Sequence, residues 1–170
     1  MYERGAIANL DALRYSFIRQ NPDSQEEKPL MNPLEYEVLI IDDSTVVRRY
    51  IREMLIESLK NYPDMKITEA ESGTHALNLI TVNTAPDLIF LDVEMPGIDG
   101  FETCQKIKEI STQPYIVMLT SRVAGDDFKK GKEAGCDKYL LKPPNPSDVK
   151  SILRIVHLRK ENIPPPGAGR

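Results

Sequence analysis

The stretch that decides the fold is residues 86–100, which read Pro86-Asp87-Leu88-Ile89-Phe90-Leu91-Asp92-Val93-Glu94-Met95-Pro96-Gly97-Ile98-Asp99-Gly100. Its apolar run is too short for a helix and is bounded by helix breakers, which indicates a strand buried on both faces, as in a parallel sheet. The run ends on the carboxylate of Asp92. A turn is predicted at Pro96 and Gly97, because proline fixes φ and glycine tolerates positive φ. The sequence therefore predicts a central strand that presents Asp92 at its exposed end.

The composition is that of an ordinary globular protein. Of the 170 residues, 41% are hydrophobic and 28% are charged, which suits one domain with a core and flanking segments. The net charge of -4 argues against a general nucleic-acid-binding surface. No apolar run approaches the roughly 20 residues that a membrane span needs, and the N-terminus has no secretion-signal pattern. We therefore expect a cytoplasmic protein that binds neither membranes nor nucleic acid directly.

Four segments are predicted along the chain. Residues 1–20 form an amphipathic helix, residues 21–35 a proline-rich linker, residues 36–161 the main domain and residues 162–170 a disordered tail of proline and glycine. The N-terminal helix could end an upstream domain, mediate dimerisation, pack on the main domain as a flap, or fray as an isolated short helix. The sequence does not choose among these, and it leaves open whether the chain is a piece of a longer protein.

The main domain alternates predicted strands with predicted helices. The strands are residues 36–41, 65–70, 87–92, 115–120 and 138–142. The helices are residues 45–60, 72–80, 101–108, 126–133 and 147–158. Ser44 or Thr45 is expected to cap the first helix, Gly135 to end the fourth and Ser147 to cap the last. This alternation predicts a doubly wound α/β fold around a five-stranded parallel sheet.

Polar side chains follow the strands at the edge of the sheet where such folds bind ligands. They are Asp42, Asp43, Asp92, Thr120 and Lys142. Crowded carboxylates favour a hard cation such as Mg²⁺, and a carboxylate can act as a nucleophile toward a phosphoryl group. Mg²⁺ and Lys142 would bring positive charge to the phosphoryl oxygens, and Thr120 would bring a hydroxyl donor. The set therefore predicts Mg²⁺-dependent phosphorylation of Asp92.

Over about residues 36–160 the chain closely resembles the receiver domain of two-component response regulators. The resemblance rests on the Asp42-Asp43 doublet, on Asp92 within Leu-Asp-Val-Glu-Met-Pro-Gly-Ile-Asp-Gly, on Thr120 after Val-Met-Leu, and on Lys142 followed by proline after Tyr-Leu-Leu. It implies the flavodoxin-like receiver fold with the sheet order 2-1-3-4-5. It also implies a phosphorylation-dependent signalling switch that phosphorylates and dephosphorylates only itself and turns over no separate substrate.

The resemblance assigns roles to the acidic residues. By it, Asp92 is the phosphoacceptor, and Asp43 and Asp92 bind Mg²⁺ directly. Asp42 acts through a water molecule on the metal, and the backbone carbonyl of Glu94 completes the protein ligands.

The remaining implied roles concern the phosphoryl group and the output. Thr120 and Lys142 bind phosphoryl oxygens, and Tyr139 holds the position of a switch aromatic residue. The implied partners are a histidine kinase or a histidine phosphotransfer protein as donor. On the output side, we expect a target or a second copy of the chain to bind the surface of the domain's fourth helix, fifth strand and fifth helix, at about residues 123–160.

Two other functions compete with the signalling switch. A Mg²⁺-dependent phosphohydrolase also uses an aspartyl nucleophile, but it wants a second aspartate two residues later, where this chain has Glu94. A flavin- or nucleotide-binding domain of similar topology wants a phosphate-binding loop rich in glycine, serine or threonine after the first strand. Asp42 and Asp43 stand there instead and would repel phosphate. Both alternatives are therefore less favoured by the sequence.

The cysteines and histidines are predicted to be structural. Cys104 and Cys136 have no metal-binding or CxxC spacing, which favours small buried thiols in a reducing compartment. His75 and His157 are expected to be exposed helix residues. Pro144 departs from the receiver pattern, in which an aromatic residue usually follows the lysine and proline.

Overall fold

A computed structural model describes residues 36–58, 65–81, 84–121 and 125–160 of the chain. The predicted N-terminal helix (1–20), linker (21–35) and C-terminal tail (162–170) lie outside the described residues. None of the helices within the described ranges is long and apolar enough to cross a membrane.

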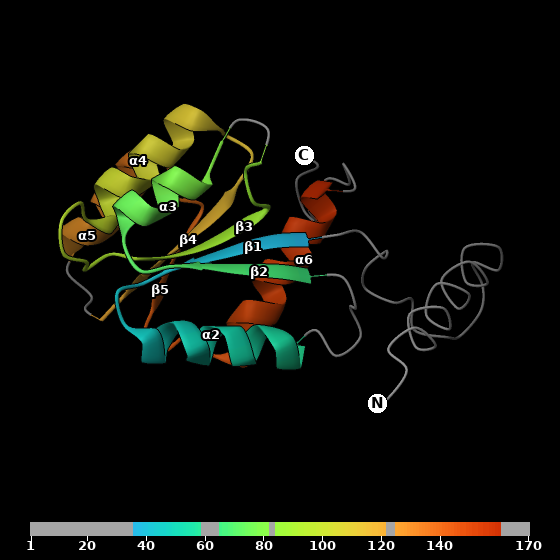
Figure 1. Ribbon diagram of the computed structural model, residues 1–170. Coiled ribbons are helices and arrows are strands. Elements are labelled where there is room, and N and C mark those ends of the chain that lie inside the picture. The colour runs from blue at the N-terminus through green and yellow to red at the C-terminus, as the bar shows by residue number, and fades with distance from the viewer. Residues whose placement is uncertain (1–35, 59–64, 82–83, 122–124, 161–170) are drawn as a thin grey trace, which may run out of the picture.

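The described residues contain one sheet of five parallel strands, which confirms the predicted doubly wound architecture (Figure 1). The strands run in the order β2-β1-β3-β4-β5. Their bounds are β1 Tyr36–Ile41, β2 Met65–Ala70, β3 Leu88–Asp92, β4 Tyr115–Thr120 and β5 Lys138–Leu141. The predicted and observed bounds agree to within one residue, and the fifth strand ends one residue before Lys142.

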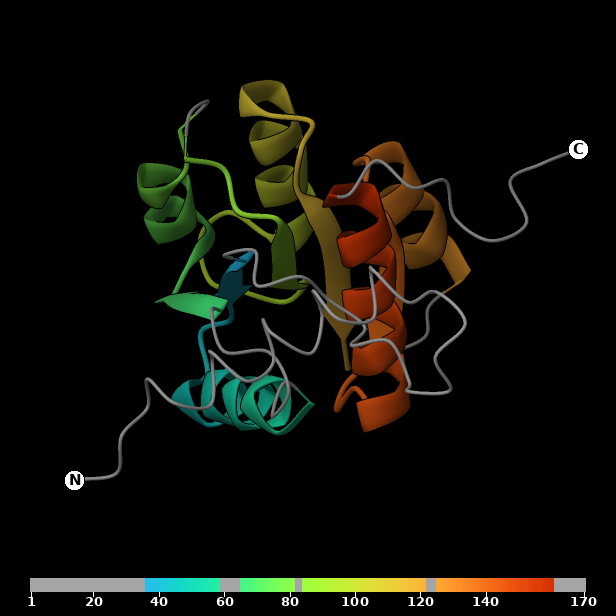
Figure 2. The same ribbon diagram turned by 90° about the vertical axis from the view of Figure 1, so that its right-hand side faces the viewer.

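Helices cover both faces of this sheet (Figures 1 and 2). One face carries α3 Gly73–Leu79, α4 Gly100–Ile110 and α5 Gly125–Glu133. The other carries α2 Thr45–Ser58 and α6 Pro146–Lys160, which pack against each other. The helices α2 to α5 each join two parallel strands, as crossover connections require, and α6 follows the last strand.

Two hydrophobic cores follow from the two-residue period of the strands. Val38 and Ile40 of β1 pack with the inner faces of α2 and α6, whereas Leu39 and Ile41 pack with α3 and α4. Every residue of β3 is buried, as the continuous apolar run predicted. The sheet edge that carries Asp92 is therefore anchored in the interior from both sides.

The helix ends agree with the predicted caps in all but one case. Ser44 caps α2 by accepting from the Val47 amide at 3.4 Å. Gly135 lies two residues after the end of α5 and has a φ of 86°, a left-handed conformation that prevents the helix from continuing. The prediction for Ser147 was wrong: Asn145 caps α6, and its Oδ1 accepts the Asp148 amide at 2.9 Å. Proline at position 146 is well suited to the first helical turn because it lacks an amide that would need a partner.

Of the two histidines, one was predicted wrongly. His75 is exposed as expected, but His157 is buried, and its Nδ1 lies 2.8 Å from the Tyr36 hydroxyl in a hydrogen bond. The physical reason is helical spacing, because position 157 lies four residues after Leu153 and eight after Val149 on the inner stripe of α6. His157 therefore joins the α6 core to the first strand.

The prediction of buried thiols is confirmed for Cys104 and only in part for Cys136. Cys104 is one of the buried residues of α4, Cys136 is half-buried, and both are free thiols. Burial raises the pKa of Cys104 to about 12, and the neighbouring Cys136 adds to the rise. A thiol held neutral in this way is a poor nucleophile.

Candidate functional site

Strand register brings the predicted site residues to one edge of the sheet. Ile41 of β1 pairs with Leu91 of β3, so the residues that follow them, Asp42 and Asp92, are neighbours across the two strands. The pairing of β4 with β5 sets Thr120 opposite Leu141, directly before Lys142. Side chains from four separate parts of the chain are therefore assembled by the sheet alone.

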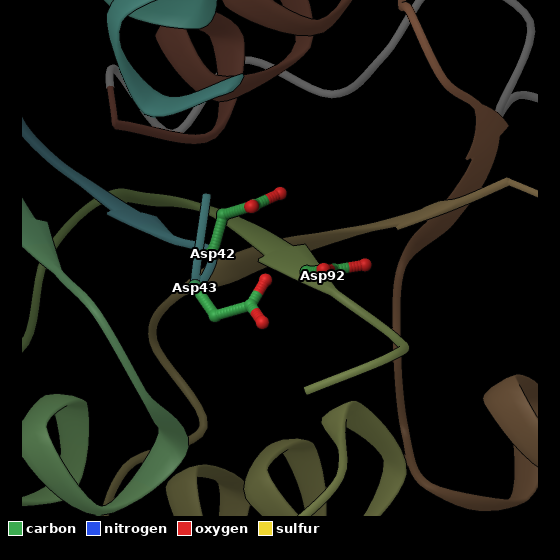
Figure 3. A group of neighbouring side chains, drawn as sticks. All are labelled: Asp42, Asp43 and Asp92. Atoms are coloured by element: carbon green, nitrogen blue, oxygen red, sulfur yellow. The ribbon is translucent and has the colours of Figure 1, made fainter. Parts of the chain in front are cut away.

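Three carboxylates form a cluster at this edge (Figure 3). One oxygen from each of Asp42, Asp43 and Asp92 lies within 4.8 Å of the other two. Asp42 and Asp92 are buried, whereas Asp43 is exposed and faces solvent. Three carboxylate oxygens at this separation, two of them from buried side chains, form a ligand set that suits a hard divalent cation.

Lys142 bridges the two buried carboxylates. Its ammonium donates to Asp42 Oδ2 at 2.6 Å and lies 2.8 Å from Asp92 Oδ1. Burial alone would lower the pKa of Lys142, but hydrogen bonds and attraction to Asp42 and Asp92 outweigh it and raise the pKa above 10.5. Lys142 is therefore a permanent cation in the site. The sequence predicted its approach to Asp92 but not its bond to Asp42.

The Asp92 carboxylate is oriented by its own turn as well. Its Oδ1 accepts the backbone amide of Glu94 at 3.1 Å. Burial raises the pKa of Asp92 above its ordinary value of 3.8, a rise that the bond from Lys142 opposes and the charge of Asp42 reinforces. The carboxylate is thus held in a fixed direction in a site that penalises its charge. Glu94 itself is exposed, and the role of its carbonyl oxygen as a metal ligand stays a prediction.

Gly100 is a site residue to which the sequence alone assigned no role. A Cβ at this position would overlap the Asp92 carbonyl oxygen and approach Val93 Cα to 2.7 Å. The Gly100 amide donates to the Val93 carbonyl at 3.0 Å. The start of α4 therefore packs directly on the backbone of Asp92, and only glycine allows this approach. A glycine at the end of the turn was the available signal in the sequence.

Thr120 and Tyr139 lie beside the carboxylate cluster, on β4 and β5. Thr120 is buried, and its carbonyl accepts the Lys142 amide at 2.8 Å. The Tyr139 hydroxyl is buried although part of the side chain is exposed. Burial raises the pKa of Tyr139, and Thr120 is the largest influence that opposes the rise. The Tyr139 ring also packs edge-on against Phe128 of α5, with ring centroids 6.3 Å apart.

Comparison with known proteins finds one family over most of this domain. The model of the response regulator receiver domain family matches residues 38–154. The transcriptional regulatory protein ResD of Bacillus subtilis is 40% identical over 121 residues, which are 71% of this chain and 47% of that protein. The chemotaxis protein CheY of Halobacterium salinarum is 36% identical over 121 residues, which are 71% of this chain and 96% of that protein.

Solved structures agree with the sequence comparison. A two-component response regulator from Clostridium difficile superimposes with a TM-score of 0.65 at 28% identity, over 75% of this chain and 99% of that one. The match with ResD covers only about half of that relative. The chain thus spans about half the length of several curated relatives that it matches and nearly all of a CheY protein.

Proposed function

The chain belongs to the response regulator receiver domain family of two-component signalling, and from this premise we propose that it is a switch controlled by phosphorylation of Asp92. One observation carries the proposal. Asp92 lies at the end of the central strand as a member of the carboxylate cluster, with the ammonium of Lys142 2.8 Å from its Oδ1. A nucleophile, a metal-binding set and a fixed cation are the parts that phosphoryl transfer to a carboxylate requires.

The proposed reaction forms one bond and breaks one. A carboxylate oxygen of Asp92 attacks the phosphorus of a phosphohistidine on a kinase or phosphotransfer protein. The O–P bond forms as the P–N bond breaks, and the imidazole nitrogen keeps the electron pair and takes a proton from solvent. Acetyl phosphate would serve as a small donor in the same way, with acetate leaving. Hydrolysis of the acyl phosphate later returns Asp92 to its starting state.

Receiver domains generally bind Mg²⁺, and the residues at this edge fit that ion. Asp43 and Asp92 would hold it directly, Asp42 through a water molecule, and Glu94 through its carbonyl oxygen. When bound, the ion neutralises negative charge on the phosphoryl oxygens. Asp43 is the exposed member of the cluster, so it provides the entry side of the site.

Lys142 and Thr120 would stabilise the transferred group. In the unphosphorylated protein the Lys142 ammonium is engaged by Asp42 and Asp92. On phosphorylation the ammonium would give up one of these contacts and bind an oxygen of the phosphoryl group on Asp92 instead. The buried Thr120 hydroxyl would donate to another phosphoryl oxygen.

The proposed output runs from Thr120 through Tyr139 to the surface of the domain's fourth helix, fifth strand and fifth helix. We call this surface the α5–β5–α6 face. This face includes the exposed apolar side chains Phe128 and Leu141, which are 65% and 50% exposed, and the exposed Lys129, Lys130 and Lys150. Movement of Thr120 toward the phosphoryl group would stabilise one position of Tyr139 and hence of Phe128. Phosphorylation would then shift an existing equilibrium toward the state that binds a target or a second copy of the chain.

The proposal is tested by intact-protein mass spectrometry after incubation with acetyl phosphate. The wild-type protein should gain one phosphoryl group with Mg²⁺ present and almost none in EDTA. Asp92→Asn should gain none. Asp99→Asn is the matched control, because Asp99 lies in the same turn and caps α4 by accepting from the Glu102 amide, a bond that asparagine can also accept. Phosphate on Asp92→Asn at the wild-type level would rule out the proposal.

A further inference from the structure

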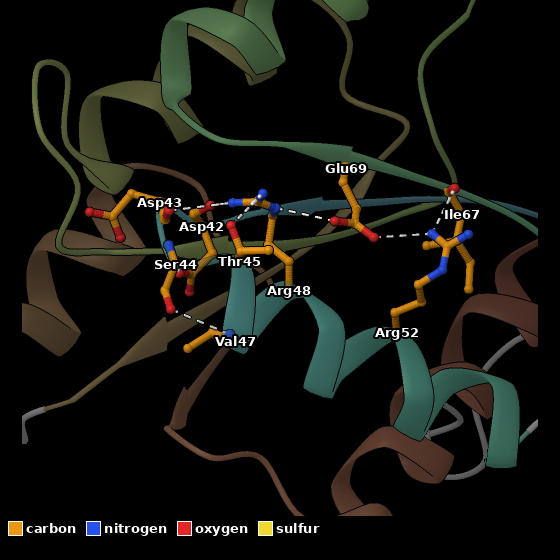
Figure 4. A network of polar contacts seen from close by, with 9 residues as sticks. All are labelled: Asp42, Asp43, Ser44, Thr45, Val47, Arg48, Arg52, Ile67 and Glu69. Carbon is orange, nitrogen blue, oxygen red and sulfur yellow. Dashed lines mark hydrogen bonds and ion pairs between the residues drawn. The ribbon is translucent and has the colours of Figure 1, made fainter.

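A cluster of charged side chains links the end of β1 to α2 and β2 (Figure 4). The guanidinium of Arg48, in the first turn of α2, donates to the Asp42 carbonyl oxygen at 2.8 Å and to the Asp43 carbonyl oxygen at 3.4 Å. It also donates to Thr45 Oγ1 at 3.3 Å. One side chain therefore contacts the main chain of both aspartates and the start of the helix that follows them.

Glu69 of β2 holds the other edge of this guanidinium. Arg48 Nε donates to Glu69 Oε2 at 3.2 Å, and Arg52 donates to Glu69 Oε1 at 3.1 Å. The Arg52 side chain is tied in turn to the Ile67 carbonyl at 3.4 Å. Only 12% of the Arg48 side chain is exposed. Because a planar guanidinium with several fixed partners has few alternative rotamers, Arg48 is a rigid part of this edge.

Arg48 contacts the backbone just past the end of β1, where the hydrogen bonds of the sheet no longer hold it. The Asp42 amide still donates to Ala70 of β2, at 3.2 Å, but β1 itself ends at Ile41. Beyond that point the carbonyl groups of Asp42 and Asp43 have Arg48 as their hydrogen-bond donor. The same carbonyls belong to the residues whose side chains form the carboxylate cluster. Their backbone dihedrals decide where those carboxylates point.

We propose that Arg48 is a positioning residue for the metal-binding carboxylates. Anchored on Glu69, its forked guanidinium holds the backbone of Asp42 and Asp43 so that their side chains meet Asp92 at the separation a cation needs. The inference rests on the proposed function, because it assigns Arg48 a part in the same Mg²⁺ site. Groups that orient metal ligands without touching the metal typically change its affinity by about 10- to 100-fold when removed.

A plain charge argument predicts the opposite effect. Arg48 is a cation close to an anionic site, so removing its charge should strengthen the attraction of the site for Mg²⁺. Loss of positioning should weaken binding. The sign of the change in Mg²⁺ affinity therefore separates the two accounts.

The test is calorimetric titration of the full chain with MgCl₂ for the wild type, Arg48→Ala, Arg48→Lys and Arg49→Ala. Arg49 is the matched control, because it is the next residue on α2, its side chain is 78% exposed and it pairs with Glu53 of the same helix at 2.9 Å. We expect Arg48→Ala to bind Mg²⁺ about 10-fold more weakly and Arg49→Ala to bind as the wild type does. Arg48→Lys should also bind weakly, because an ammonium keeps the charge but cannot form the fork.

A second measurement, made without metal, tests the effect of Arg48 on the backbone of this turn separately from Mg²⁺ binding. The Ser44 amide donates to Asp42 Oδ1 at 2.8 Å, so its hydrogen exchange reports the order of this turn. It should exchange faster in Arg48→Ala and Arg48→Lys than in Arg49→Ala. Wild-type or tighter Mg²⁺ binding by Arg48→Ala, or full recovery by Arg48→Lys, would overturn the inference. If the wild type itself binds no Mg²⁺, the proposed function fails, and unchanged Ser44 exchange in Arg48→Ala would then overturn the positioning role as well.

Discussion

Asp42 and Lys142 are 100 positions apart in the chain, yet the Lys142 ammonium lies 2.6 Å from Asp42 Oδ2. The same ammonium lies 2.8 Å from Asp92 Oδ1, so two buried carboxylates share one cation and the three side chains together keep one negative charge. This arrangement makes the stability of the domain and the chemistry of the site depend on the same three side chains. Removing any one of them changes both.

Lys142→Ala should destabilise the metal-free domain. It leaves Asp42 and Asp92 buried without their shared cation, and breaking a buried pair from one side costs on the order of 3 kcal/mol. Urea unfolding in EDTA measures the loss, with Lys138→Ala as control because Lys138 is an exposed residue of the same strand. Mg²⁺ should restore more stability to Lys142→Ala than to the wild type. Equal free energies of unfolding for Lys142→Ala and Lys138→Ala would contradict the bridging role.

Asp92→Asn should raise the melting temperature of the metal-free protein at neutral pH. Burial raises the pKa of Asp92, so the folded state binds this proton more tightly than the unfolded chain does. Stability then falls as pH rises from the ordinary value of 3.8 through the raised folded value, and the charge stays unfavourable above it. The gain of Asp92→Asn should therefore shrink as the pH is lowered toward 3.8. Calorimetric scans in EDTA over this range check the sign, and a lower melting temperature for Asp92→Asn at neutral pH would refute it.

Thr120→Ala should separate phosphorylation from output. Asp92 and Lys142 stay in place, so the variant should still accept phosphate, although more slowly. Without the hydroxyl, the position of Tyr139 should no longer respond to the modification. Hydrogen exchange or NMR shifts of α5 and β5 with and without beryllofluoride measure the response. Thr120→Ser is the control, since it keeps the hydroxyl and should keep the change; a full response in Thr120→Ala would exclude this coupling.

Gly100→Ala should damage the site through the backbone. The added methyl group would overlap the Asp92 carbonyl oxygen, and overpacking of this kind costs about 1–3 kcal/mol. Gly97→Ala is an instructive comparison: Gly97 has a φ of 86° and an added methyl group would have no neighbour within 4 Å among the described residues, so its cost is backbone strain alone, about 1 kcal/mol. Phosphorylation by acetyl phosphate should slow in Gly100→Ala and stay close to wild type in Gly97→Ala. Slower phosphorylation in Gly97→Ala than in Gly100→Ala would show that phosphorylation does not need the close approach of α4 to the Asp92 backbone.

The main features of the fold could be predicted because they depend on local pattern. Short apolar runs that end on Asp42, Asp92 and Thr120 mark buried parallel strands, and parallel strands bring their carboxyl ends to one edge. The register then assembles the cluster without further information. The sequence order of the strands and the resemblance to receiver domains were enough to place these residues together.

Two features that were missed depend on contacts between distant segments, and a third, the cap of α6, depends on a choice between two local capping residues. In the sequence Arg48 is one of several arginines on a predicted helix, and only the fold shows that Glu69 of β2 lies beside it. The burial of His157 needs the inner stripe of α6 to be extended by one residue, toward Tyr36. The cap of α6 was predicted two residues late because Asn145 and Ser147 are both good capping types, and only the observed bond to the Asp148 amide distinguishes them.

The most direct test of the central claim is chemical mapping of the phosphorylated residue. Sodium borohydride reduces an aspartyl phosphate to homoserine, and tandem mass spectrometry of peptides identifies the position. After treatment with acetyl phosphate and Mg²⁺, the account predicts homoserine at position 92 in the wild type and none in Asp92→Asn or in EDTA. Homoserine at position 42 or 43 in the wild type, with none at position 92, would contradict it.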